Sequence, residues 1–304
     1  MNDRRLQVTA AESVRRRLTH GLIPAVPVPF RGRTLDRDAL AAYAQWMALH
    51  PVAGVAVNVH TGRGRQLSEE TRRQVLGTWR AALPDRVLVA GAWNVASAAE
   101  ARELGADAVL AFAPSGQDPL AYHVELAREL PVIAFYLYQA AGGTDYDDAT
   151  LREVLAAPGV VGIKVATLDS VMTFQRIAAL CRSLPDTLLI TGEDRFLGYS
   201  LLLGARSALI GMGSALTDLQ AGLLRAHAAE DWPRFVWLSD ACDRFGAATF
   251  TPPMEGYVRR MLWAAAADGG LPGDACDDPW GPSLPPAERD AVVRAVRDAR
   301  AVGG

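Results

Sequence analysis

Lysine is almost absent from this 304-residue chain, because all but one of its 31 basic residues are arginines and the exception is Lys164. The 34 acidic residues nearly balance them and leave a net charge of −3, so the chain lacks the excess positive charge that binds nucleic-acid phosphates. It also lacks an apolar run of roughly 18 residues, the length that spans a membrane. These absences predict a protein that binds neither nucleic acid nor a membrane, and they leave the single lysine to be explained.

Cysteine is scarce as well. Cys181, Cys242 and Cys276 are far apart and lack the spacing of metal ligands, so we expect reduced thiols in a cytoplasmic protein. The five histidines do not cluster at the ends of neighbouring strands, and we expect neither a metal ion nor another cofactor. Residues 1–20 lack the apolar core of a secretory signal, and we expect them to form a short leading helix.

The chain does contain a regular alternation of short apolar runs with Ala- and Arg-rich helical stretches. This alternation predicts an α/β fold: a (β/α)8 TIM barrel at residues 21–227, followed by a C-terminal helical extension at residues 228–304 that packs on the barrel. An open doubly wound sheet would carry a glycine-rich phosphate turn after the first run, and Val28–Gly32 does not match that pattern. The eight runs are Leu22–Phe30, Gly54–Val59, Val87–Trp93, Ala108–Pro114, Val132–Tyr138, Gly162–Ala166, Leu188–Glu193 and Ala208–Gly213.

The single lysine lies on the sixth run, and the active site of such a barrel lies at the carboxyl ends of its strands. Because strand side chains alternate between two faces, Lys164 shares its face with the small residues Gly162 and Ala166, which leaves room for a ligand. On the fifth run, Tyr136 and Tyr138 share one face. If that face points inward, it presents a phenol near the lysine.

A buried lysine in this position suits Schiff-base chemistry. A free lysine amine has a pKa near 10.4, so only about one in 2,500 is neutral at pH 7, and burial increases that fraction by lowering the pKa. The neutral amine attacks a ketone to form an imine, whereas arginine stays charged and does not. The alternative is a structural lysine that pairs with a buried carboxylate.

Several segments form a recognisable pattern. Val161-Gly-Ile-Lys164 is a lysine-bearing strand, and Tyr136 lies 28 residues before the lysine. The other segments are Gly21–Phe30, His60–Ser68, Gly192–Asp194 and Gly204–Ile210. Over nearly the whole chain, this pattern resembles the dihydrodipicolinate synthase/N-acetylneuraminate lyase family of class I aldolases, with the lysine strand and the tyrosine spacing as its most specific part.

The resemblance implies that Lys164 forms a Schiff base with pyruvate or another 2-oxo acid and that Tyr136 acts as the proton shuttle. It also implies that the Ile210 carbonyl lies near the lysine nitrogen. Because members of the family form dimers or dimers of dimers, the resemblance further implies a homo-oligomer.

The same resemblance implies that the substrate carboxylate is held after the second strand, where the family has two adjacent hydroxyl residues. Here the pair is His60-Thr61, followed by the Gly62 turn. Amides that open a helix suit an anion, so Thr61 and Gly62 retain this function. His60 replaces a hydroxyl residue, and both general acid–base catalysis and simple packing remain open for it.

Three departures separate the chain from dihydrodipicolinate synthase itself. Arg63 replaces the family's glutamate, Leu137–Gly143 replaces the segment whose arginine holds the second substrate, and Ala113–Gly116 replaces an aromatic pair. We therefore expect a second substrate different from that of dihydrodipicolinate synthase. The candidates for that half of the site are Arg63, Arg65, Tyr138, Gln139 and Glu193.

The leading hypothesis is a Schiff-base-dependent aldolase or lyase that acts on a 2-oxo acid through Lys164. Dehydration of a 2-keto-3-deoxy sugar acid through the same imine is an alternative, and a condensation or hydratase-aldolase step on an aromatic or specialised substrate also stays open. A hypothesis of another class is a catalytically silent barrel with a binding or regulatory role. The resemblance implies a tyrosine–hydroxyl–tyrosine proton relay, of which His60 and Ala113–Gly116 replace two elements, and this alteration favours a silent barrel. The presence of both Lys164 and Tyr136 disfavours it.

Overall fold

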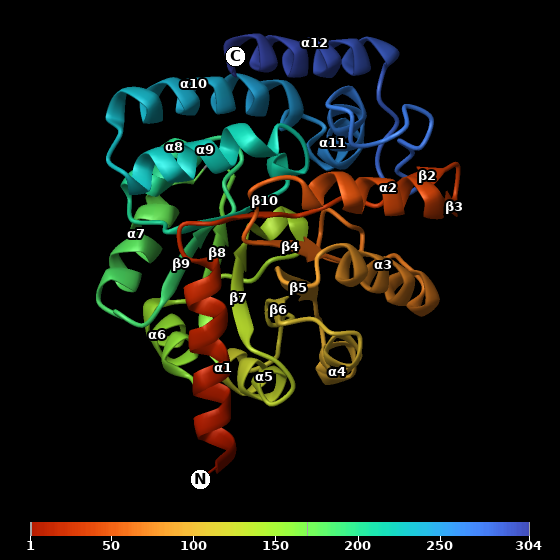
Figure 1. The fold of residues 1–304 in the computed structure, drawn as a ribbon. Coiled ribbons are helices and arrows are strands. Elements are labelled where there is room, and N and C mark those ends of the chain that lie inside the picture. The colour runs from red at the N-terminus through yellow and green to blue at the C-terminus, as the bar shows by residue number, and fades with distance from the viewer. Residues whose placement is uncertain (1, 169, 304) are drawn as a thin grey trace.

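Eight parallel strands form a barrel with helices around it in the computed structural model, which describes residues 2–168 and 170–303 (Figure 1). Hydrogen bonds join the strands in the order β1-β10-β9-β8-β7-β6-β5-β4, and a bridge between Ala25 and Ala56 closes the ring. Each strand coincides with one of the eight apolar runs, so the predicted TIM barrel is confirmed. The strands are β1 (Leu22–Pro24), β4 (Gly54–Val57), β5 (Val87–Gly91), β6 (Ala108–Ala111), β7 (Val132–Leu137), β8 (Val160–Ala166), β9 (Leu188–Thr191) and β10 (Ser207–Ile210).

The helices between the strands begin and end at recognisable sequence signals. Ser68 caps α3 (Glu69–Ala82) by accepting the N–H of Thr71. Gly105 follows the end of α4 (Val95–Glu103) and has a φ of 83°, which glycine adopts readily. A short antiparallel pair, β2 (Phe30–Arg31) and β3 (Thr34–Leu35), follows β1. The barrel helices are α2 (Arg37–Ala48), α3 (Glu69–Ala82), α4 (Val95–Glu103), α5 (Pro119–Ala127), α6 (Asp148–Ala156), α7 (Val171–Arg182), α8 (Leu197–Leu202) and α9 (Thr217–Ala228).

The two faces of the barrel strands belong to different cores. The outward face packs against the surrounding helices, and the inward face fills the barrel together with the first helix, α1 (Asn2–Leu18). Ala11, Val14 and Leu18 of α1 are buried in that inner core, and Arg15 Nε donates to the Val161 carbonyl of β8 at 3.1 Å. Since α1 covers the amino ends of the strands, a ligand enters from the carboxyl ends.

Three further helices follow the barrel: α10 (Trp232–Thr249), α11 (Tyr257–Ala267) and α12 (Pro286–Gly303). They lie together along one side of the barrel, where α10 packs against α9 and α12 packs against both α10 and α11 (Figure 1). A short 3₁₀ turn, Met254–Gly256, precedes α11. The helices expected in the C-terminal extension are therefore present. The first and last residues of the expected segments, Met1 and Gly304, lie outside the described residues.

None of the helices in residues 2–168 and 170–303 is long and apolar enough to cross a membrane.

Candidate active site

Lys164 lies on β8 with its amine in a small cavity of about 50 Å³ at the carboxyl end of the barrel. Its side chain is almost fully buried, and Nζ lies 4.2 Å from the centroid of the Phe135 ring. Room for the lysine comes from Gly192, where an added Cβ would lie 2.6 Å from the Lys164 Cε atom. The sequence thus leaves space for the amine by placing glycine at the end of β9.

Burial controls the charge of the amine. Loss of solvent lowers the pKa of Lys164, and the charges of Asp194 and Glu193 work in the opposite direction. Burial likewise raises the pKa of the Asp194 carboxyl, whose Oδ1 atom accepts the N–H of Met212 at 2.7 Å. Both pKa shifts favour the neutral forms. The neutral fraction of the Lys164 amine, which is the nucleophilic form, is therefore larger than that of a lysine in water.

The expected position of Tyr136 is wrong. Phe135 is paired with Lys164 across the β7–β8 ladder and Tyr136 with Val165, so the phenol points outward to the helices. Its hydroxyl donates to Asp145 Oδ1 at 2.8 Å and lies outside the lysine cavity. The spacing of 28 residues fits the family pattern, but spacing alone does not set which way a side chain points. The register of β7 against β8 shifts near Val132 and places Phe135 on the inward face.

Tyr138 provides a phenol at the lysine cavity instead. β7 ends at Leu137, and the chain then turns into a short 3₁₀ segment, which frees Tyr138 from the alternation of the strand. Its side chain lines the cavity together with Lys164, and burial raises the pKa of Tyr138 to about 12. The phenol therefore stays protonated at neutral pH and is a hydrogen-bond donor.

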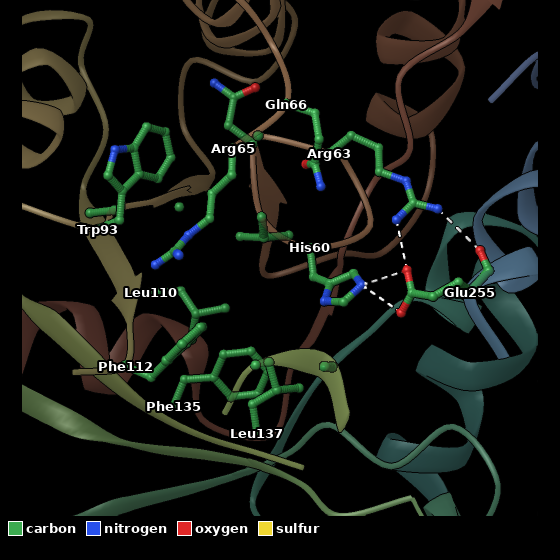
Figure 2. A pocket seen from close by; sticks show the side chains of 17 residues that line it. His60, Arg63, Arg65, Gln66, Trp93, Leu110, Phe112, Phe135, Leu137 and Glu255 are labelled. Atoms are coloured by element: carbon green, nitrogen blue, oxygen red, sulfur yellow. Dashed lines mark hydrogen bonds and ion pairs between the residues drawn. The ribbon is translucent and has the colours of Figure 1, made fainter. Parts of the chain in front are cut away.

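His60 lines both the lysine cavity and a second, larger cavity, which Figure 2 shows. Its Nε2 atom is 3.1 Å from both carboxylate oxygens of Glu255, a residue of the turn before α11. The hydrogen bond with His60 is the main cause that lowers the pKa of Glu255 to about 2. Glu255 is therefore ionised over the physiological range and holds the imidazole in place.

Arg63, a candidate residue for binding the second substrate, pairs with two carboxylates of the protein. Its Nη1 donates to Glu255 Oε2 at 2.7 Å, and its Nη2 donates to the buried Asp278 Oδ2 at 2.7 Å. The left-handed φ of 54° at Arg63 turns the loop so that these bonds form. This network ties the loop after β4 to the C-terminal extension.

Thr61 lines the lysine cavity, and its hydroxyl lies 3.1 Å from the Tyr257 hydroxyl, at the start of α11. Gly62 is packed behind it, because an added Cβ would lie 3.1 Å from the Val26 carbonyl and 3.2 Å from the Asn58 nitrogen. Thr61 thus faces the site, and Gly62 shapes the loop.

Three other candidates lie away from the lysine cavity. Glu193 points back and accepts the backbone N–H groups of Thr167 and Leu168, so it holds the loop after β8. Ile210 belongs to the outer core, and its carbonyl accepts the N–H of Ala25 at 2.9 Å. Gln139 donates to Asp145 on the outer side of β7. Gly211 and Asp194, one residue beyond Ile210 and Glu193, line the cavity instead.

Sequence reasoning missed the contribution of the C-terminal extension. Phe250, Met254 and Tyr257 line the lysine cavity, and Glu255 and Asp278 hold the loop after β4. These residues lie more than about 80 positions after Lys164, and no local pattern connects them to the strand ends. Asp194 was predictable from the sequence, because it lies three residues after the end of β9 and continues the alternation of Leu188 and Ile190, which point inward.

No group of three or more histidine, cysteine, aspartate or glutamate side chains in the described part of the chain is arranged to hold a metal ion.

The fold and site define a class: a (β/α)8 barrel with a buried lysine at the carboxyl ends of its strands. The model of the Dihydrodipicolinate synthetase family matches residues 18–231, and the chain belongs to that family, whose named members include lyases and aldolases. The chain is 28% identical to the 4-hydroxy-tetrahydrodipicolinate synthase of Phenylobacterium zucineum (strain HLK1), over 92% of this chain and 97% of that protein.

Solved structures share the fold at lower identity. The Ruminococcus gnavus sialic acid aldolase superposes with a TM-score of 0.81 at 18% identity, covering 94% of this chain and 99% of that one. The Oceanobacillus iheyensis dihydrodipicolinate synthase superposes with a TM-score of 0.80 at 19% identity, covering 96% and 99%. The same fold therefore occurs in proteins that are named for different substrates, and the barrel alone does not select among them.

Proposed function

We propose that the protein is a class I aldolase or lyase in which Lys164 forms a Schiff base with pyruvate or another 2-oxo acid. The observation that carries the proposal is the environment of this one lysine: a buried amine, with a lowered pKa, in a cavity kept open by Gly192. The cavity at the amine is small, but it shares lining residues with the adjoining larger cavity, and the two together give a 2-oxo acid and a second substrate room beside Lys164.

The surrounding groups support each step. The neutral Lys164 amine attacks the ketone carbon, and water leaves as the imine forms. The Thr61 hydroxyl is placed to donate to the substrate carboxylate, and the protonated Tyr138 phenol is a second donor in the same cavity. Loss of a proton from the methyl carbon then gives the enamine, the carbon nucleophile of an aldol reaction.

His60 is the group we assign to the proton transfer at the second substrate. It lines both cavities, and Glu255 holds its ring. In condensation, the enamine carbon bonds to an aldehyde carbon, and the aldehyde oxygen takes a proton from His60. In cleavage, His60 takes that proton back as the carbon–carbon bond breaks. Water then hydrolyses the imine and restores the amine.

Two observations weigh against the alternatives. One wall of the larger cavity is apolar and consists of Trp93, Leu110, Phe112, Phe135 and Leu137, and polar side chains that include His60, Arg65 and Gln66 line the remainder. An acceptor with an apolar face fits that wall better than the hydroxyl-bearing chain of a 2-keto-3-deoxy sugar acid does. A silent barrel has no need for a glycine that makes room for the lysine, nor for an amine whose pKa is lowered.

Reductive trapping tests the proposal. Incubation with pyruvate and borohydride is expected to add one reduced pyruvyl group to the peptide that carries Lys164, detected by mass spectrometry. A Lys164→Arg variant provides a sharp control because it contains no lysine at all. A His60→Gln variant is expected to keep the trapped adduct and to lose turnover with the second substrate. Failure to trap Lys164 with a panel of 2-oxo acids would overturn the proposal.

A homo-oligomer is part of the same proposal. The exposed apolar side chains Tyr199, Leu202 and Val236 surround one hollow between α8 and α10. An exposed apolar cluster of this kind marks a contact surface. We therefore expect α8 and α10 to be covered by a second copy of the chain.

A further inference from the structure

The larger cavity beside the lysine has a distinctive wall. It has a volume of about 340 Å³ and shares Val59, His60, Phe135 and Leu137 with the lysine cavity. The shared residues make the two cavities adjacent, so a molecule in the larger one lies next to an imine on Lys164. Small-molecule sites begin near 300 Å³, and about 150 Å³ already accommodates benzene, so this cavity has room for a ring system with substituents.

The inner wall of the larger cavity is aromatic and aliphatic. Trp93 follows β5, Phe112 follows β6, and Phe135 lies on β7, so three neighbouring strands deliver rings to one side (Figure 2). Phe112 and Phe135 form an edge-to-face pair, with ring centroids 6.0 Å apart and planes at 72°. Leu110 and Leu137 fill the remaining wall. A flat apolar ligand gains from such a wall both burial and ring–ring contact.

The outer part of the larger cavity carries a positive charge. Arg65 is exposed, and its guanidinium carbon lies 5.2 Å from the centroid of the Phe112 ring. Figure 2 shows this side chain reaching toward Leu110 and Trp93. Arg63 is close by, but its charge is balanced by Glu255 and Asp278. Arg65 is therefore the cation that the cavity offers to a bound anion.

We infer that the larger cavity is the acceptor half of the site and takes an aromatic aldehyde with an acidic group on its ring. The ring would pack against Phe112, Phe135 and Trp93, the acidic group would pair with Arg65, and the aldehyde would point to His60 and Lys164. This inference rests on the proposed Schiff base, because the enamine on Lys164 is the nucleophile.

The reaction balances without any further reactant. Pyruvate and the aromatic aldehyde give a 4-aryl-4-hydroxy-2-oxobutanoate, with one new carbon–carbon bond. The methyl carbon loses one proton, and the aldehyde oxygen gains one. Loss of water from this product gives the aryl-substituted unsaturated 2-oxo acid, and the reverse direction releases pyruvate and the aldehyde.

Steady-state rates with a matched set of aldehydes test the inference. The set comprises 2-carboxybenzaldehyde, benzaldehyde and glyceraldehyde, each with pyruvate, with products measured by liquid chromatography and mass spectrometry. We expect kcat/KM to be at least tenfold higher for benzaldehyde than for glyceraldehyde, and higher again for the carboxylated ring. A preference for glyceraldehyde would overturn the inference.

Two variants locate the binding groups. Arg65→Met is expected to remove the advantage of the carboxylated ring over benzaldehyde, and Phe112→Ser is expected to raise KM for both aromatic aldehydes at least tenfold. Arg152→Met, which changes an exposed arginine of α6, serves as the control and is expected to leave the discrimination unchanged. An equal effect of Arg65→Met on the charged and uncharged rings would contradict the role of Arg65.

Borohydride trapping with pyruvate alone separates the two proposals. Trapping on Lys164 without turnover of any aromatic aldehyde refutes the acceptor assignment and leaves the Schiff base intact. Absence of trapping refutes the Schiff base itself. Trapping in both Arg65→Met and Phe112→Ser at the wild-type level shows that these variants fold and keep the lysine site.

Discussion

At the scale of single residues, the surroundings of Lys164 decide its protonation state. Burial lowers the pKa of the amine, and the nearby Asp194 partly opposes this. A lysine whose pKa is lowered becomes neutral, and hence nucleophilic, at a lower pH than a lysine in water. The pH dependence of imine formation reports this directly.

We expect the rate of imine formation with pyruvate to rise with pH and then to reach a plateau. The midpoint of the rise is expected well below 10.4, the pKa of lysine in water. The Asp194→Asn variant removes a negative charge near the amine and is expected to move the midpoint further down. Stopped-flow or quench trapping across a pH series measures both. A midpoint at or above 10.4 would contradict the role of burial.

A second prediction at this scale concerns the glycine beside the lysine. In Gly192→Ala, the new Cβ would lie 2.6 Å from Lys164 Cε and 3.0 Å from the Val165 carbonyl, so the amine has to move. We expect kcat/KM to fall at least tenfold and the free energy of unfolding to drop by about 1–3 kcal/mol. The comparison is Gly77→Ala on α3, where nothing lies within 4 Å.

For the Gly77→Ala control, we expect the free energy of unfolding to change in the opposite direction. An alanine in the interior of a helix is favoured over glycine by roughly 1 kcal/mol, so its free energy of unfolding should rise while activity stays unchanged. Urea unfolding and steady-state kinetics measure the two quantities. Wild-type activity of Gly192→Ala would contradict the hypothesis that Gly192 is needed to leave space for the Lys164 side chain.

At the scale of elements, the C-terminal extension completes the site. The loop after β4 carries His60, Thr61 and Arg63, and all three have partners in or near α11. The strongest link is the buried pair of Arg63 and Asp278, in which both side chains are at most 7% exposed. Loss of the Asp278 charge leaves the buried Arg63 guanidinium paired with Glu255, which is 45% exposed, and removing one partner of a buried ion pair is strongly destabilising.

We expect Asp278→Asn to lower the free energy of unfolding by about 3 kcal/mol, since breaking a buried pair typically costs that much. Asp274→Asn is the matched control, because Asp274 pairs with Arg31 but is 68% exposed, and exposed pairs contribute less than about 1 kcal/mol. Chemical denaturation measures both. Equal losses in the two variants would show that the Arg63–Asp278 pair does not anchor the extension.

At the scale of the whole molecule, an apolar surface is exposed beside α8 and α10. Val236 is 65% exposed, and Leu202 and Tyr199 lie around the same hollow. Contact with a second copy would remove this surface from water. The larger cavity opens elsewhere, at the carboxyl ends of β4 to β7, and shares no lining residue with this hollow, so such a contact leaves it accessible.

We expect Val236→Asp to shift the protein toward a smaller species in sedimentation velocity, because a charge placed in an apolar contact is costly to bury. Leu49→Asp changes an isolated exposed leucine at the end of α2 and is expected to leave the sedimentation unchanged. If Val236→Asp sediments as the unaltered protein does, the surface of α8 and α10 is not an interface.

The elements of the barrel were predictable because they depend on local patterns. Short apolar runs predict strands, Ser68 predicts the start of a helix, and Gly105 predicts the end of one, each from neighbouring residues alone. The position of Lys164 on an inward face among small residues was predictable for the same reason. The sequence by itself thus determined the TIM barrel, its strand order along the chain and the place of the lysine.

The tertiary structure decided which side chains meet the lysine. The register of β7 against β8 turns Phe135 inward and Tyr136 outward, and a shift of one residue in a strand exchanges its faces. The same one-residue rule separates Asp194, in the cavity, from Glu193, behind it. The contacts of His60 and Arg63 with the extension join residues almost 200 positions apart, and only folding brings such distant residues together.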